Sequence, residues 1–99
     1  MEDIKKHYVV KKESDIAWDR IEEDVFIILT RKNEEKVFKL NKTAGFLWEN
    51  CDGKKTIQDL VKILCKQFDV NEEEALADIR VFVDQMKNMH LISLSVPGT

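Results

Sequence analysis

The sequence predicts an α+β fold, in which a three-stranded antiparallel sheet is followed by a three-helix bundle in a winged helix-turn-helix-like order. Two observations predict it. The first half carries short β-branched and aromatic runs separated by polar residues, which is typical of strands. The second half carries apolar residues at helical spacing, preceded by residues that cap helices. With 99 residues, the chain is long enough for one domain with a single core.

The first half of the chain is expected to be built from strands. Residues 1–15 come first and should form either an N-terminal arm or a short strand. Residues 16–21 alternate partly between apolar and polar side chains, and residues 25–30 give the clearest strand because they are β-branched and aromatic. Residues 31–35 are polar and predict a hairpin loop, so residues 36–40 should be the strand that closes the hairpin. We therefore expect an antiparallel meander of three strands.

The first expected helix spans about residues 42–51. Asn41 is suited to cap it, because the side-chain oxygen accepts one of the free N–H groups of the first turn. Asp52-Gly53 should end the helix in a turn. Three apolar side chains recur at helical spacing in between: Leu47, Trp48 and Cys51.

Two longer helices are expected to follow. Thr56 and Asp59 form a capping box at the start of a helix that runs to about residue 68, and Asn71 with Glu74 forms the next, for a helix that runs to about residue 88. Their apolar stripes are Ile57, Leu60, Val61, Leu64 and Phe68 in the first, and Ala75, Leu76, Ile79, Phe82, Val83 and Met86 in the second. The residues expected to return to the sheet are Leu91, Ile92 and Leu94.

The composition indicates a soluble globular protein. Hydrophobic residues make up 43% and charged residues 35% of the chain, and no apolar run approaches the roughly 20 residues that a membrane helix needs. The first residues lack the apolar core of a signal peptide, so we expect a cytoplasmic protein with no membrane partner. In that compartment Cys51 and Cys65, which lack CxxC spacing, should be free thiols. The net charge of −3 argues against a nucleic-acid partner.

The sequence does not indicate catalytic chemistry. His7 and His90 are its two histidines, and they lie far apart, each near the end of an expected element. No HExxH, GxSxG, Walker or Gly-rich nucleotide motif occurs. The spacing of the cysteines and histidines matches no zinc module, and the acidic run at residues 72–74 is explained by the helix dipole. We therefore expect no enzyme activity, no metal site and no cofactor.

The strand at residues 36–40 should be an edge of the meander, with unpaired N–H and C=O groups along one side. It contains no proline. Lys36 and Lys39 have a simple interpretation as charges that protect the edge from aggregation. The alternative is β-augmentation, in which an extended peptide pairs with the edge and neighbouring pockets give specificity.

A pattern of particular residues joins the end of this strand to the first helices. It reads Leu40-Asn41, two residues, Ala44, then Trp48, Asp52-Gly53 and Thr56, and Asp78-Ile79 and Leu91-Ile92 fit it further along the chain. The pattern resembles that of PqqD-like domains, also called RiPP recognition elements. These are small modules that hold the leader segment of a precursor peptide for a modifying enzyme. The resemblance covers roughly residues 16–94, so residues 16–95 are expected to be the leader-peptide-binding domain.

The resemblance also implies where a peptide would bind. In that family the leader adds as a fourth strand beside the third strand, in a groove bordered by the third helix, which places the backbone partners at residues 36–40. Within this strand, alternation predicts that Phe38 and Leu40 face the core. Arg80 and Lys87 lie two turns apart on one helix face, where they would meet an acidic leader. The implied peptide-binding residues are Lys36, Val37, Phe38, Lys39, Leu40, Leu76, Ile79, Arg80, Val83 and Lys87.

Three functions remain open at this point. The first is a binding module that delivers a precursor peptide to a maturation enzyme, such as a radical-SAM enzyme or a protease. The second is a winged-helix DNA-binding regulator, which needs a basic recognition helix, whereas residues 72–88 carry more acidic than basic side chains. The third is a small assembly subunit that pairs through its edge strand, because the apolar run at residues 25–29 leaves an outer sheet face that needs cover.

Overall fold

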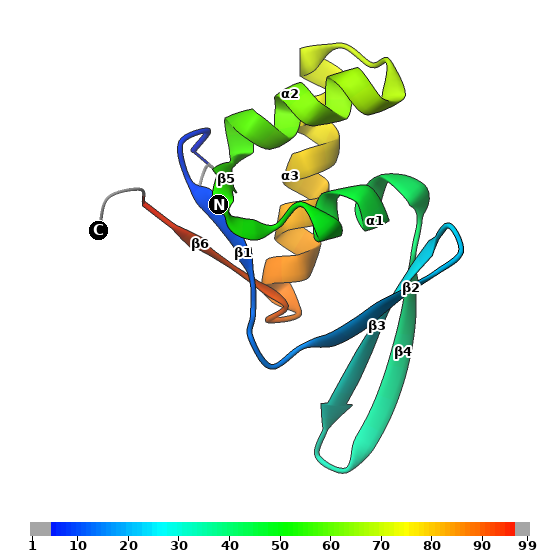
Figure 1. Cartoon of the computed structure of the whole chain (residues 1–99). Coiled ribbons are helices and arrows are strands. Elements are labelled where there is room, and N and C mark those ends of the chain that lie inside the picture. Colours follow the sequence, from blue (N-terminus) through cyan, green and yellow to red (C-terminus); the bar gives the residue numbers. More distant parts are fainter. Residues whose placement is uncertain (1–4, 97–99) are drawn as a thin grey trace.

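The protein is an α+β structure with two small sheets and three helices, seen in a computed structural model that describes residues 5–96 (Figure 1). The first four residues of the expected N-terminal arm therefore lie outside the described residues. The strands are β1 (Val9–Lys12), β2 (Ala17–Ile21), β3 (Asp24–Arg31), β4 (Glu34–Leu40), β5 (Asp52–Thr56) and β6 (Ile92–Ser95), and the helices are α1 (Lys42–Glu49), α2 (Ile57–Phe68) and α3 (Glu72–Asn88).

The meander expected in the first half is confirmed as one of the two sheets, with strand order β2-β3-β4. Both pairings are antiparallel, with Trp18 opposite Ile27 and Ile27 opposite Phe38. The hairpin between β3 and β4 turns at Lys32 and Asn33, which both adopt a left-handed backbone conformation (φ 52° and 64°). A tight turn of this kind requires positive φ at its central residues, and asparagine tolerates it well.

The expectation of a single sheet followed by a helix bundle is wrong. A second antiparallel sheet has the order β5-β1-β6, so it joins three segments that are far apart in the sequence. Its central strand is β1, whose Val10 is fully buried. Asp52 and Gly53 begin β5 instead of forming only a turn after α1. The polar sequence of β5 gives no strand pattern of its own, and its extended backbone is held by pairing with β1.

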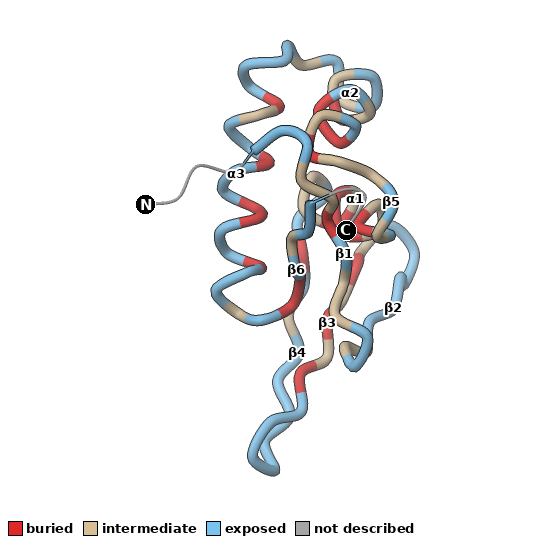
Figure 2. The backbone as a smooth tube through the Cα atoms, turned by 90° about the vertical axis from the view of Figure 1, so that its left-hand side faces the viewer, coloured by how far each residue is buried: buried red, intermediate tan, exposed pale blue. Residues whose placement is uncertain are grey.

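The helices pack on the sheets around one core, shown by the buried positions in Figure 2. Helix α1 lies against β3, where Gly45 permits a close approach: a Cβ atom on Gly45 would lie 3.1 Å from a methyl group of Val25. Leu47 and Trp48 of α1 are fully buried, and α2 packs against α3. Within residues 5–96, no helix combines the length and the apolar character needed to cross a membrane.

Candidate functional site

The free edge of β4 is the first feature of the candidate site. Strand β4 pairs with β3 along one side, and no other strand in residues 5–96 pairs with its second side. Its sequence contains no proline, so every residue of β4 retains a backbone N–H. Half of the backbone groups of such a strand point away from its neighbour, where an extended segment is able to pair with them.

The two faces of β4 meet different surroundings. Lys36, Phe38 and Leu40 lie opposite Leu29, Ile27 and Val25 of β3, which are buried, so this face points toward the core. Leu40 is buried and Phe38 is half-buried against the core, as the alternation predicts. Val37 and Lys39 point to the outer face of the sheet, and Val37 is 58% exposed.

Two hollows lie beside these elements, one lined by β4 and the α3 cap residue Met89, and the other lined by α1 and α3. The first, about 420 Å³, has an apolar floor of Leu29, Phe38 and Met89 and is surrounded by four charged residues of the β3–β4 hairpin. The second, about 240 Å³, lies between the start of α1 and α3 and includes Val81. Figure 2 shows β4 on the side of its sheet nearer α3, with β2 on the far side. We call the surface formed by both hollows and the free edge of β4 the β4–α3 groove.

A hydrogen bond holds one end of this groove. The Arg31 guanidinium, at the end of β3, donates to the backbone oxygen of Met89 over 2.9 Å. Met89 is the C-cap residue of α3, so the contact ties the hairpin to the end of the helix. A cation at the C-terminus of a helix also suits the negative end of the helix dipole.

Not all residues that the resemblance implied for α3 lie along this groove. Ile79 and Val83 are fully buried in the core, and Leu76 is half-buried against it. Lys87 borders a different hollow, together with Tyr8 and Leu94, which faces the β1–β6 side of the molecule. Arg80 shares the helix face of Lys87 because the two are seven residues apart. Among the described residues, neither Arg80 nor Lys87 lines the two hollows of the groove, while a further hollow brings Lys87 together with Arg31.

The residues of α3 that do border the groove were not identified from the sequence. Asp78, Val81 and Gln85 lie on the helix face next to the core stripe, and Met89 follows at the helix cap. Phe82, which belongs to the expected core stripe, also lines this part of the groove. Val81 gave the available signal, since it is an apolar residue outside the core stripe. In the structure it is 58% exposed.

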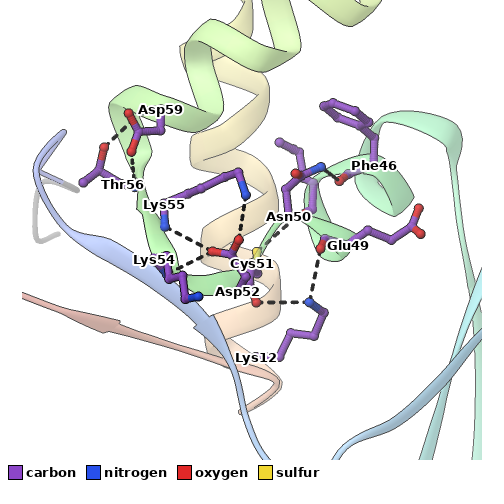
Figure 3. Close-up of polar contacts among 11 residues, drawn as sticks. Lys12, Phe46, Glu49, Asn50, Cys51, Asp52, Lys54, Lys55, Thr56 and Asp59 are labelled. Carbon is purple, nitrogen blue, oxygen red and sulfur yellow. Dashed lines mark hydrogen bonds and ion pairs between the residues drawn. The ribbon is translucent and has the colours of Figure 1, made fainter.

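A polar cluster lies at the end of α1 (Figure 3). The Lys12 ammonium of β1 donates to the backbone oxygens of Glu49 and Cys51, over 3.4 and 3.1 Å. It also lies 5.3 Å from the ring centre of Trp18 and 5.7 Å from that of Trp48. Lys12 therefore connects the β5-β1-β6 sheet with α1 and β2. Its ammonium group donates to carbonyl oxygens at the end of α1 and lies near two aromatic rings.

Burial and charge set the ionisation of this cluster. Partial burial lowers the pKa of Lys12, and burial raises the pKa of Cys51 to about 12, so this thiol stays protonated and unreactive at neutral pH. The Lys55 ammonium, with help from the backbone N–H groups of Lys54 and Lys55, holds the pKa of Asp52 at about 2. Cys51 and Cys65 are both free thiols, and residues 5–96 contain no group of three or more His, Cys, Asp or Glu side chains that would hold a metal.

Comparison with known proteins gives three results. Among solved structures, the fold matches "TbiB1 in Complex with the TbiA(beta) Leader Peptide", with a TM-score of 0.73, 18% sequence identity, and coverage of 84% of this chain and 94% of that chain. A search of curated proteins found no match. The family model described as coenzyme PQQ synthesis protein D (PqqD) matches residues 27–92, which is more than half of the chain and includes both β4 and α3. The resemblance seen in the Leu40–Thr56 pattern is therefore confirmed, and the chain belongs to the PqqD family.

Proposed function

We propose that this protein binds the leader segment of a ribosomally made precursor peptide as an added strand beside β4 and presents it to a modifying enzyme. The binding surface lies within residues 16–95, which form the leader-binding domain. The protein acts in the cytoplasm. Strand β1 is part of the second sheet and contacts the end of α1 through Lys12.

The free edge of β4 next to an apolar hollow is the observation that carries this proposal. Strand addition gives affinity through main-chain hydrogen bonds, while specificity comes from pockets that receive alternate side chains. The β4–α3 groove provides both parts, since β4 is unpaired on one side and Leu29, Phe38 and Met89 form an apolar floor beside it. Seven residues of β4 are available, which corresponds to an extended peptide of about seven residues.

The family and the fold support the same proposal. The PqqD family model covers β4, α1, α2 and α3. TbiB1, whose fold this chain shares, was solved in complex with a leader peptide. The role we propose is positional: the module raises the effective concentration of the precursor near a maturation enzyme, such as a radical-SAM enzyme or a protease, and supplies no catalytic group of its own.

A pair of proline substitutions tests the proposal. In an antiparallel ladder, the N–H groups of adjacent residues point to opposite sides of the strand. Of Lys36→Pro and Val37→Pro, one therefore removes an N–H from the bond with β3 and the other removes one from the free edge. Both side chains are exposed, so the two variants differ in the direction of the lost N–H and in the Lys36 charge, and Lys36→Gln controls for the loss of that charge.

We expect the free-edge variant to remain folded and to lose at least about 1 kcal/mol of peptide binding, the value of one or two hydrogen bonds. The other variant should lose stability instead. The probes are synthetic peptides that tile the short open reading frames flanking the gene, measured by fluorescence anisotropy. If both variants stay folded and bind like the wild type, the peptide does not pair with β4.

An assembly subunit is a second candidate that one observation favours. The outer face of the β2-β3-β4 sheet exposes Ile21 and Val37, each 58% exposed, beside the half-buried Phe26 and Ile28. Exposed apolar patches mark interaction surfaces in soluble proteins. Light scattering at about 100 μM distinguishes the two roles, because a self-assembling subunit would be dimeric without peptide, whereas a peptide carrier is complete as a monomer.

A further inference from the structure

The β4–α3 groove carries charges of opposite sign at its two ends. We infer that it selects peptides in which a bulky apolar side chain is flanked by acidic residues near the β3–β4 turn, while the other end of the peptide is not acidic. This inference rests on the proposed function and specifies which peptides that function accepts.

The hairpin end of the groove is basic. Arg31, Lys32 and Lys36 surround the hollow of about 420 Å³, and Glu34 is the one acidic residue that lines it in the part of the chain that the structure describes. Arg31 is engaged with the backbone of Met89. The side chains of Lys32 and Lys36 make no hydrogen bond or ion pair with any residue in the described range 5–96, and both are exposed. Two cations thus remain available beside an apolar floor.

The position of Lys36 strengthens this point. It lies directly opposite the buried Leu29 and on the same face of β4 as Phe38, and it lines the same hollow as both. A lysine that only protected the edge from aggregation would serve equally well on the outer face, where Lys39 stands and pairs with Asp24 over 3.5 Å. Lys36 is therefore placed to meet a charge on a bound segment.

The opposite end of the groove is acidic. Asp78 borders the hollow of about 240 Å³ between α1 and α3, together with Asn41, Thr43 and Gln85, and no basic residue among those the structure describes lines that hollow. Within residues 5–96, the Asp78 carboxylate has no hydrogen bond or ion pair. A carboxylate on the peptide at this end would meet a like charge, whereas a neutral or basic side chain would not.

The consequence is a charge order for the bound peptide. Its apolar anchor enters the Leu29–Phe38–Met89 hollow, an Asp or Glu beside that anchor approaches Lys32 and Lys36, and its far end tolerates Lys, Arg or neutral residues near Asp78. Attraction at one end and repulsion at the other also fixes the register and the direction of an added strand, which backbone hydrogen bonds alone do not specify.

A selection from a random 12-residue peptide library, displayed on phage and panned on the immobilised full chain, tests the inference. The wild type is compared with the double variant Lys32→Glu/Lys36→Glu and with Asp78→Lys. The control is Lys62→Glu/Lys66→Glu on α2, which has the same change in net charge on exposed positions away from the groove. Circular dichroism confirms that each variant is folded.

We expect wild-type binders to carry Asp or Glu next to a large apolar residue. Their affinity should fall about tenfold on the double variant, as two partly exposed ion pairs would give, and remain unchanged on the α2 control. Raising the salt concentration should reduce this difference because both cations are exposed. Asp78→Lys should admit acidic residues at the far end of the peptide while the preference at the hairpin end is retained.

Two other outcomes are informative. In the first, the selected peptides lose binding to the free-edge proline variant but show no charge preference. That result would overturn the inference and leave the proposed function intact. A selection that returns no peptides dependent on β4 would overturn the proposed function and this inference with it.

Discussion

Replacing Trp48 should show how much the junction between α1 and the two sheets contributes to the stability of the fold. The Trp48 side chain is fully buried, and its ring makes an edge-to-face contact with Trp18, with centroids 6.3 Å apart and planes at 85°. Removing a large buried aromatic side chain costs about 3–5 kcal/mol. The indole Nε1 of Trp48, however, has no hydrogen-bond partner in residues 5–96. Its removal relieves an unsatisfied buried donor that costs about 1–3 kcal/mol.

These two terms predict different results for two substitutions. Trp48→Ala should lose about 3 kcal/mol of unfolding free energy, toward the low end of the range for such a cavity, which corresponds to roughly 15 °C in melting temperature for a domain of this size. Trp48→Phe keeps an aromatic ring and removes the unsatisfied donor, so it should lose only about 1 kcal/mol.

Urea unfolding followed by far-ultraviolet circular dichroism measures both variants without relying on the fluorescence of the replaced residue. A loss below about 1 kcal/mol for Trp48→Ala would refute the buried-anchor reasoning. If Trp48→Phe proved as damaging as Trp48→Ala, the Nε1 group would have a partner, and the assignment of an unsatisfied donor would be wrong.

The remaining predictions concern pH, backbone conformation and nucleic acid. The pKa of Asp52 is about 2 in the folded protein, below its ordinary value of 3.8. Its contribution to the free energy of unfolding is therefore present above about pH 4 and is lost as the pH falls toward 2. Asp52→Asn should lose less unfolding free energy than the wild type over this pH window, as measured by urea unfolding. Gly53→Ala should cost about 1 kcal/mol in the same assay, because Gly53 has φ of +80° and a Cβ there would lie 3.3 Å from the Lys11 side chain; wild-type stability would argue against this conformation. In anisotropy titrations at physiological salt, duplex DNA from the upstream region should show no sequence-specific binding, because α3 begins with three glutamates, and specific binding below about 1 μM with a steep salt slope would favour a regulator.

Local signals in the sequence predicted the helices and the meander well. Asn41 accepts a hydrogen bond from the N–H of Ala44 at the start of α1, and Thr56 and Asp59 form the expected capping box at the start of α2. Asn71 caps α3 in the same way. These elements were predictable because a cap is decided by residues three positions apart.

The second sheet was not predictable from local patterns. Strand β5 contains Asp, Gly, two Lys and Thr, of which only Thr favours strands, and it is extended because it pairs with β1, some forty residues earlier. Strands β1 and β6 are four residues each and come from the two ends of the chain, with Val10 opposite Leu94. Pairing at such sequence separation is a tertiary effect that overrides local preference.

The candidate site was predictable in part. The edge position of β4 follows from the order of strands in the meander, and the alternation correctly places Phe38 and Leu40 toward the core. The sequence did not predict which face of α3 borders β4. An apolar stripe identifies the helix face that points to the core, but it does not show which side of that stripe lies beside the sheet edge. Val81 and Asp78 lie on one flank, and Arg80 and Lys87 lie on the other.

The most direct test of the central claim is a nuclear magnetic resonance titration of the ¹⁵N-labelled protein with the tightest-binding peptide from the tiled or displayed sets. Strand addition predicts the largest amide shifts in β4 and along the Asp78–Met89 flank of α3, together with slowed amide exchange at alternate residues of Glu34–Leu40. Shifts confined to α2 around Cys65, with no change in β4 or α3, would contradict the account.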